Sequence, residues 1–160
     1  MKNGKKELMI DIKTLRKSVR GKKVLIDSNI IVYLTEEIEP FCRLAQELFF
    51  MIEEGLSNAV ISILSVCEVM QGPLRAGKID IAMALKKYLV NFPNNNCQHV
   101  TLEVLDKVGV DERVNWKTLR AVDSLIVASG LYAKADLFIS NDRHFKKSLT
   151  SEMLLSFGRF

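Results

Sequence analysis

The chain has 160 residues, 48% of them hydrophobic, and a formal net charge of +4, which suits one domain with a well-buried core and excludes two comfortable domains. No apolar stretch reaches the roughly 18 uncharged residues of a membrane-spanning helix, and the N-terminus lacks the apolar segment of a secretory signal, so we expect a cytoplasmic protein without membrane association. Three scattered cysteines, Cys42, Cys67 and Cys97, form no CxxC or Cys/His cluster and argue against both a disulfide framework and a zinc site.

The positive charge is concentrated at the N-terminus. Residues 1–23 contain nine Lys or Arg and two Asp or Glu, a net charge of +7, whereas residues 24–160 carry −3. We therefore expect a basic N-terminal extension, residues 1–20, ahead of the main domain at 21–160. A solvated segment with one exposed helix face is the simplest interpretation. A helix that contacts RNA, an oligomer contact and a flexible extension are the alternatives, since such a segment attracts polyanions.

The first predicted elements are a strand, a helix and a second strand. KKVLIDS (22–28) is a short apolar run with β-branched residues, which is typical of a buried strand. Residues 40–54 carry apolar side chains at helical spacing, and Gly55 is placed to end that helix as its C-cap. NAVISI (58–63) is a second apolar run and predicts the second strand.

A helix is then expected over SVCEVMQG (65–72). Ser65 would be its N-cap, and Glu68 follows three residues later, which is the spacing of a capping box. In that interpretation the Glu68 side chain only reaches back to the Ser65 amide. The sequence favours this role and a functional role about equally.

The second half of the chain continues the alternation. Helical periodicity is present at 78–91 and 101–113, and the polar loop between them leads into a short strand near 97–101. AVDSLIVASGLYAKA (121–135) predicts an apolar helix whose small residues suit close packing on a sheet, and DLFISN (136–141) predicts the next strand. The closing EMLLSF segment is a last short strand or helix.

Strands and helices therefore alternate, with no hairpin signal between successive strands. Alternating elements with wholly apolar strands indicate a parallel sheet covered by helices on both faces. The predicted fold class is α/β.

Four carboxylates, Asp27, Glu68, Asp123 and Asp142, lie within or just beyond apolar runs, where a lone acid is normally exposed to water. Burying an unpaired carboxylate costs on the order of several kcal/mol unless it protonates or pairs with a cation. Asp27 is the penultimate residue of the first predicted strand, Glu68 lies one helical turn beyond the second, and Asp142 comes just after the strand at 136–141. Asp123 lies near the start of a helix that would begin at the same edge. Because functional clefts lie at the carboxyl ends of parallel strands, we expect the four acids to converge there.

A divalent cation would relieve the repulsion between converging carboxylates. Oxygen ligands without His or Cys favour Mg²⁺ or Mn²⁺ over zinc. Such an ion acidifies a bound water into a nucleophile, and two ions about 4 Å apart would stabilise both oxygens of an in-line phosphoryl displacement. The expected substrate is a phosphate ester.

Each acid also has an ordinary structural explanation. Asp27 could cap the helix that follows it, and Asp142 could be a turn residue. Asp123 could cap its helix or form an ion pair with Arg120 or Lys117. One at a time these explanations compete with function, but four acids at one edge of a predicted sheet favour a shared site.

The motifs resemble those of the PIN-domain ribonucleases, most of all the VapC-type toxins of toxin-antitoxin pairs. VLIDSNIIVYL is similar to the first family motif, in which an acid at a strand end, here Asp27, is followed by a small hydroxyl residue and then by Asn29. SVCEVMQG is similar to the second motif, with Glu68 in the helix after the second strand.

LRAVDSLIVASGLYAKADLFISNDRHF resembles the third and fourth motifs run together. Asp123 opens a helix, and Asp142 follows Ser140 in the pattern S/T-x-D-x-x-F. The resemblance spans most of the chain and implies a PIN-like three-layer α/β/α sandwich with a central, mostly parallel sheet. His144 departs from the family, which often has an acid or another polar residue there.

This resemblance implies a metal-dependent endoribonuclease in which Mg²⁺ or Mn²⁺ activates a water to attack an RNA phosphodiester bond. By motif match, Asp27, Asp123 and Asp142 would be metal ligands, and Glu68 would bind the metal directly or through water. The residues that would support the site by hydrogen bonds are Asn29 and Ser140. The resemblance further implies an RNA substrate, a cognate antitoxin and a homodimer.

Other functions remain as alternatives. A PIN-like RNA-binding or RNA-processing module without a toxin role, including an inactive one, fits the same fold. Receiver domains and haloacid-dehalogenase-type phosphatases also carry acid pockets, but the first need an acidic pair before the phosphorylated Asp and the second a D-x-D after strand one. Asn29 occupies the second Asp position, so the sequence disfavours both.

Overall fold

The computed structural model describes residues 9–158, and residues 1–8 of the expected basic extension lie outside this range. The strands are β1 Lys23–Ile26, β2 Asn58–Ser62, β3 Asn95–Gln98, β4 Leu137–Ile139 and β5 Leu154–Leu155. The helices are α1 Ile12–Val19, α2 Ser28–Thr35, α3 Cys42–Glu53, α4 Ile63–Arg75, α5 Ile79–Val90, α6 Leu102–Leu105, α7 Ala121–Tyr132 and α8 Arg143–Ser148, with a 3₁₀ turn, η1, at Trp116–Thr118.

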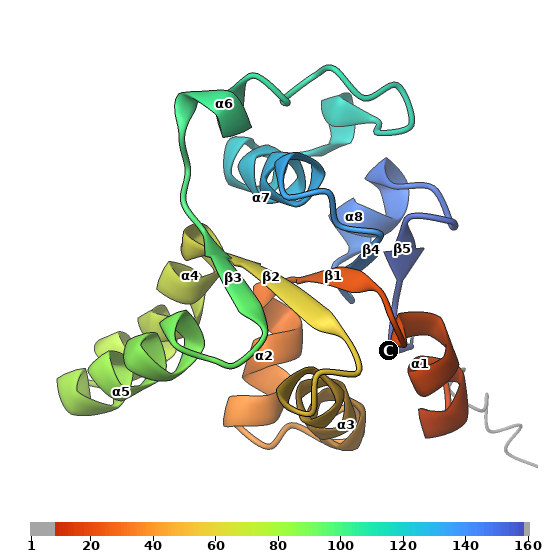
Figure 1. Ribbon diagram of the computed structural model, residues 1–160. Helices are drawn as coiled ribbons and strands as arrows, with labels where there is room; N and C mark the ends of the chain where they lie inside the picture. Colours follow the sequence, from red (N-terminus) through yellow and green to blue (C-terminus); the bar gives the residue numbers. More distant parts are fainter. Residues whose placement is uncertain (1–8, 159–160) are drawn as a thin grey trace, which may run out of the picture.

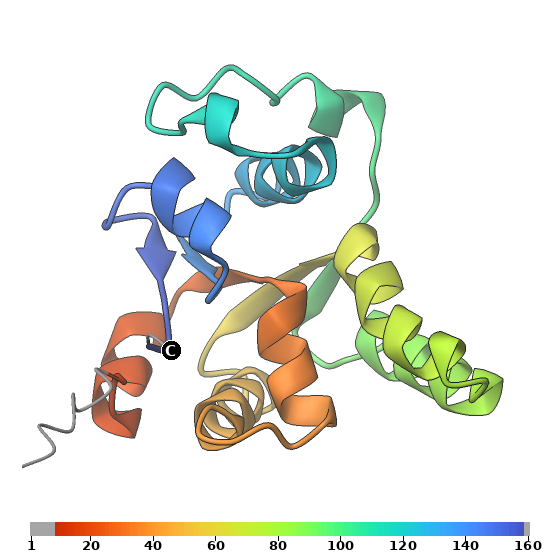
Figure 2. The same cartoon turned by 180° about the vertical axis from the view of Figure 1, so that it is seen from behind.

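The five strands form one parallel sheet in the order β3-β2-β1-β4-β5. Helices α2 and α3 cover one face of this sheet and α7 covers the other, as Figures 1 and 2 show from opposite sides. The predicted α/β architecture with a central parallel sheet is therefore confirmed. Because the five strands are parallel, their carboxyl ends all lie at one edge of the sheet, called here the carboxyl edge.

The central strands β1 and β4 carry apolar side chains toward both faces of the sheet because both faces are buried there. Val24 and Ile26 of β1 belong to the core under α2 and α3, whereas Leu25 between them packs with α7. This is the period-two alternation of a strand between two layers. Within the described residues, no helix is long and apolar enough to cross a membrane.

Helix α7 packs closely on the sheet through Gly130. A Cβ atom at this position would lie 2.5 Å from Phe138 Cε1 and 2.9 Å from Leu25 Cδ1. The small residues of this helix were expected to allow close packing on the sheet. Gly130 does so, because a side chain at this position would collide with β1 and β4. Because α7 carries Asp123 near its other end, this contact also fixes the site described below.

The described part of the basic extension is folded onto the domain. Leu15 and Val19 of α1 are fully buried in the core, and Arg16 pairs with Glu47 of α3. Ahead of α1, the Ile10 amide donates a hydrogen bond to the Phe157 carbonyl, with N···O 2.9 Å. The segment is therefore attached to the domain from Ile10 onward, and α1, which begins at Ile12, packs against α3.

Two predicted elements differ from the structure. The strand expected near 97–101 is β3, which begins earlier, at Asn95, and lies at the edge of the sheet. An edge strand tolerates polar side chains, so its asparagines concealed it. The helix expected over 101–113 was wrong in extent, because α6 ends at Leu105 and turns follow, with Gly109 at φ +84°.

Candidate functional site

The four sequence-selected acids all lie on segments at the carboxyl edge. Asp27 directly follows β1, and Asp142 comes three residues after β4. Glu68 is in the second turn of α4, which begins as β2 ends. Helix α7 runs back toward the start of β4, so Asp123 in its first turn lies at the same edge.

Asp27 is a buried carboxylate with only two hydrogen bonds, its exposed fraction being 5%. Its Oδ1 accepts from the Ser28 amide at 2.8 Å, which makes it the N-cap of α2, and its Oδ2 accepts from Ser140 Oγ at 2.6 Å. Burial raises the pKa of Asp27 to about 6 despite these bonds, and nearby Asp142 and Asp123 raise it further. The carboxylate is therefore incompletely compensated by the protein alone.

Asp123 has a cation beside it. It is 7% exposed, and its Oδ2 accepts a hydrogen bond from Arg120 Nε at 3.3 Å. Of the two ion pairs considered from the sequence, the one with Arg120 is present. The Arg120 side chain is 74% exposed, so water screens this pair and its strength is small.

Asp142 begins α8 rather than occupying an ordinary turn. Its Oδ1 accepts from the His144 amide at 2.6 Å, and its own amide donates to Ser140 Oγ at 3.0 Å. Ser140 thus contacts both Asp27 and Asp142 through one hydroxyl group. These hydrogen bonds are compatible with the supporting role expected of Ser140, which stays a prediction.

The predicted capping box at Glu68 was wrong. Helix α4 begins at Ile63, and its N-cap is Ser62, whose Oγ accepts from the Leu64 amide at 3.2 Å. Ser65 is buried inside the first turn, and its hydroxyl has no partner within the described residues. Glu68 is consequently the sixth residue of α4, too far along to cap it, and the strongest structural alternative to a functional role is removed.

The Glu68 carboxylate also interacts with other acids. The pKa of Glu68 is raised to about 7. Desolvation is the largest cause, and the nearby charges of Asp27 and Asp123 follow. A hydrogen bond with the Ser28 side chain acts in the opposite direction. Because the residue as a whole is exposed, water screens much of this repulsion and its contribution to stability is small.

A network of amides and hydroxyls supports the loop between β4 and α8. Asn29 Nδ2 donates to Ser140 Oγ at 3.3 Å, and Asn29 Oδ1 accepts from the Asn141 amide at 3.4 Å. The Asn141 side chain donates to Tyr33 Oη at 3.3 Å and accepts from the Phe157 amide at 2.7 Å. Asn29 thus connects α2 to the loop that carries Asp142, and its supporting role stays a prediction.

Asn141 is the functional candidate that the sequence did not single out. Its side chain ties α2, the loop that carries Asp142 and the C-terminal segment to one another. The only available signal was its position between Ser140 and Asp142. Nothing in that tripeptide reveals that residues 157–158 return to the same place.

All four acids take part in electrostatic repulsion with one another. Asp27 is repelled by Asp123 and Asp142, and Glu68 is repelled by Asp27 and Asp123. In the described part of the chain, however, no three His, Cys, Asp or Glu side chains stand close enough together to hold a metal ion. The donor chemistry fits a hard divalent cation, since every acid offers carboxylate oxygen and the buried Asp27 forms no ion pair with a Lys, Arg or His among these residues.

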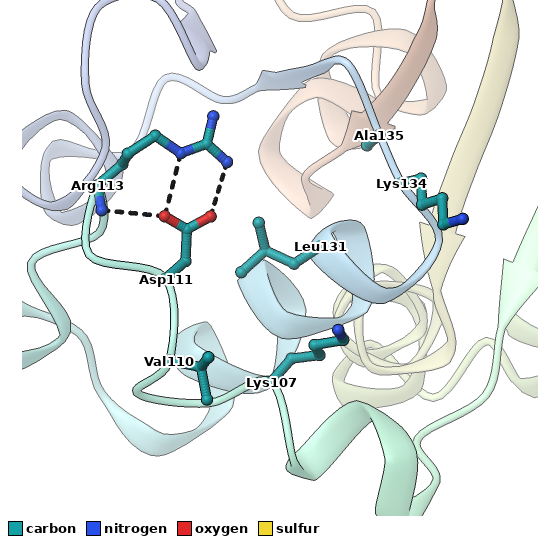
Figure 3. Close-up of a pocket in the computed structure, with 7 residues that line it drawn as sticks. All are labelled: Lys107, Val110, Asp111, Arg113, Leu131, Lys134 and Ala135. Carbon is teal, nitrogen blue, oxygen red and sulfur yellow. Dashed lines mark hydrogen bonds and ion pairs between the residues drawn. The ribbon is translucent and has the colours of Figure 1, made fainter.

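A separate hollow lies at the far end of α7 (Figure 3). It is lined by Leu131, Lys134 and Ala135 from the end of that helix, and by the segment from Lys107 to Arg113. Its acid, Asp111, is already satisfied by Arg113, with Nη2···Oδ2 at 2.7 Å. Eight residues of helix, about 12 Å, separate Asp123 from Leu131, so this hollow is distinct from the acids.

The family model of the PIN domain matches residues 24–148 of the chain. This range contains all four acids. No curated protein matches the chain.

Several solved structures are similar in fold. VapBC2 from Rickettsia felis, bound to a DNA fragment from its promoter, is 13% identical with a TM-score of 0.59, and the match covers 84% of this chain and 98% of that one. A toxin-antitoxin complex from Klebsiella pneumoniae is 19% identical with a TM-score of 0.59, covering 86% and 99%. The sarcin-ricin loop cleaving toxin VapC20 of Mycobacterium tuberculosis is 16% identical with a TM-score of 0.57, covering 78% and 93%.

Proposed function

Because the chain belongs to the PIN domain family, we propose that it is a metal-dependent endoribonuclease, which hydrolyses RNA phosphodiester bonds with a metal-activated water. The observation that carries the proposal is Asp27, a buried carboxylate that forms no ion pair within residues 9–158 and lies next to two further acids at the carboxyl edge. A shared divalent cation would compensate all of these charges together.

Each residue has a role in this proposal. Asp27, Asp123 and Asp142 would hold the ion, and Glu68 would bind it directly or through a water. When bound, Mg²⁺ or Mn²⁺ supplies an acidified water and neutralises the negative charge on the attacked phosphate.

The residues around the acids orient them. Ser140 Oγ donates to Asp27 Oδ2 and accepts from the Asp142 amide, which fixes one carboxylate and the backbone of the other. Asn29 Nδ2 donates to the same hydroxyl and so orients it. Such supporting hydrogen bonds change metal affinity or activity by about 10- to 100-fold in other metal sites.

The direct test is cleavage of single-stranded and structured RNA with and without divalent cation. We expect cleavage with Mg²⁺ or Mn²⁺, complete loss with EDTA, and recovery when excess metal is restored. Asp27→Asn and Asp123→Asn should abolish cleavage, whereas Asp80→Asn, the same change at an exposed position on α5, should not. Full activity of both site variants would exclude this function, and metal-independent RNA binding without cleavage would favour the non-catalytic alternative.

The solved neighbours that are toxin-antitoxin complexes support a toxin role with a cognate antitoxin. We propose that this role is carried out in the cytoplasm. A small gene for such an antitoxin beside the gene for this chain, and co-purification of the two products, would test that role. We also propose a homodimer. Exposed apolar side chains on α5, among them Ile79, Met83 and Val90, support a protein contact, and light scattering of the purified chain would measure its mass.

A further inference from the structure

We propose that the exposed face of α1 is an RNA-backbone binding surface that holds the substrate next to the carboxyl edge. This inference rests on the proposed ribonuclease function and names how the substrate is bound. The surface, called here the α1 stripe, consists of Lys13, Lys17 and Arg20, all of which are exposed.

The α1 stripe follows from the geometry of the helix. Residues at i, i+4 and i+7 lie on one face of a helix, and Arg20 is the C-cap residue directly after Val19, so the three cations are neighbours along about 10 Å. Leu15 and Val19 on the opposite side are fully buried in the core. The helix is thus anchored by its apolar side and presents its cations to solvent.

These cations have little compensation within the protein. Among the described residues, the ion pair of α1 joins Arg16, which lies beside the stripe, to Glu47. Asp11 ahead of the helix interacts with Lys13 but is itself fully exposed and caps α1 by accepting from the Thr14 amide at 2.7 Å. Like charges spaced at i, i+4 repel one another and destabilise a helix, and a bound polyanion would relieve that repulsion.

The proposed cleavage site needs such a surface. Four carboxylates at the carboxyl edge repel a phosphate backbone, and residues 24–160 carry a net charge of −3. Attraction for RNA must therefore come from cations outside the acid cluster. Residues 1–23, with a net charge of +7, are where the chain carries its surplus.

The placement of α1 connects the stripe to the acids. The chain enters α1 beside Phe157, whose amide donates to Asn141 in the loop that carries Asp142. It leaves α1 at Gly21, whose amide donates to the Leu56 carbonyl just before β2. Helix α1 thus runs from the carboxyl edge to the opposite edge, with Lys13 nearest the acids. In Figures 1 and 2 the C-terminal segment lies between α8 and α1.

The test measures binding of a single-stranded RNA to an Asp27→Asn background in EDTA, so that cleavage plays no part. Lys13→Gln, Lys17→Gln and Arg20→Gln are combined in one variant. The matched control combines Lys78→Gln, Lys86→Gln and Lys87→Gln, which removes the same charge from exposed positions at and on α5. Thermal melts of both variants check that they are folded.

We expect the α1 variant to bind the RNA at least about 10-fold more weakly than the unmodified surface does. The slope of log K against log salt should become shallower by about 2, because each of the three lost phosphate contacts contributes roughly 0.7. The control should change both quantities far less. Equal effects of the two variants, or no effect of either, would overturn the inference.

Two further measurements distinguish an acidic protein partner from RNA, and RNA binding from RNA cleavage. Competition by polyglutamate as effective as that by RNA of equal charge would assign the surface to an acidic protein and overturn the RNA assignment. The proposed ribonuclease function is judged separately, from cleavage by the unmodified chain. If that chain binds RNA through the α1 stripe but never cleaves it, the binding surface stands and the nuclease proposal fails.

Discussion

Asp27 shows why a single buried carboxylate can dominate the behaviour of this protein. It caps α2 and accepts a hydrogen bond from Ser140, yet burial still raises its pKa to about 6. A carboxylate that only caps a helix needs no more than a bond to a backbone amide of the first turn, and it gains nothing from burial. The raised pKa marks a charge that the folded chain does not fully neutralise, which is a property of functional carboxylates.

The stability of the metal-free protein should therefore depend on pH in a defined direction. The pKa of Asp27 in the folded state, about 6, exceeds its ordinary value, so the folded state binds more protons than the unfolded state between that ordinary value and about pH 6. Glu68, whose pKa is raised to about 7, acts in the same direction, but its contribution is small because it is exposed. Stability is then greatest near pH 4.5 and falls as pH rises through 6 to 7, by about 1 to 3 kcal/mol. Asp11 and Asp111, whose pKa values are lowered, titrate below this window.

Denaturant unfolding in EDTA from pH 4.5 to 8 measures this effect. Asp27→Asn should flatten most of the decline, and saturating Mg²⁺ should do the same in the unmodified protein. A stability that rises between pH 5 and 8 in EDTA would contradict the described environment of Asp27.

Ser140 offers a test of the supporting hydrogen bonds. Ser140→Ala removes the bond to Asp27 Oδ2 and leaves the Asp142 amide without its acceptor. We expect RNA cleavage to fall by about 10- to 100-fold, with a matching rise in the metal concentration needed for half activity. Ser129→Ala, another buried serine that donates only to Leu125 within α7, is the control and should leave metal dependence unchanged.

At the scale of elements, Asn141 joins segments that are far apart in the sequence. Asn141→Ala would free Tyr33 and the amides of Phe157 and Gly158 from the loop that carries Asp142. We expect weaker Mn²⁺ binding and a lower kcat with little change in KM. Asn141→Asp keeps an acceptor for Phe157 and should recover part of the loss, whereas equal loss in both variants would argue against this positioning role.

Helix α7 should be sensitive to any side chain at Gly130. Gly130→Ala places a Cβ atom 2.5 Å from Phe138 and should destabilise the protein by about 1 to 3 kcal/mol, because the helix must move off the sheet. Gly72→Ala in α4 meets only the Glu36 carboxylate, at 3.2 Å, and should be neutral or stabilising by up to about 1 kcal/mol. Denaturant melts of the two variants give the comparison, and similar stabilities would contradict the close packing of α7.

The elements that could be predicted from the sequence are those with a clear local pattern of apolar residues. Strands β1 and β2, and helices α3, α5 and α7, follow from apolar periodicity alone. The start of α4 was missed because both Ser62 and Ser65 can cap a helix, and the choice depends on where β2 ends. Strand β3 was shifted because an edge strand with asparagines has no apolar signature.

At the scale of the whole molecule, the acids could be selected from sequence because each interrupts an apolar run. Their common edge follows from parallel topology, since β1, β2 and β4 all end there. The role of Asn141 and the packing of α1 could not be predicted, because both depend on where residue 157 returns. Contacts between distant parts of the chain leave no local pattern.

The whole-molecule claim is that one divalent cation site draws the four acids together. Those side chains repel one another, and in the described residues they do not yet form a metal-binding group. The most direct measurement is the anomalous density of a crystal of the protein grown or soaked with Mn²⁺. We expect a peak bounded by Asp27, Asp123 and Asp142, with Glu68 within direct or water-mediated reach, and absent from the Asp27→Asn crystal. Mn²⁺ bound only elsewhere, or no peak at saturating Mn²⁺, would contradict the central claim.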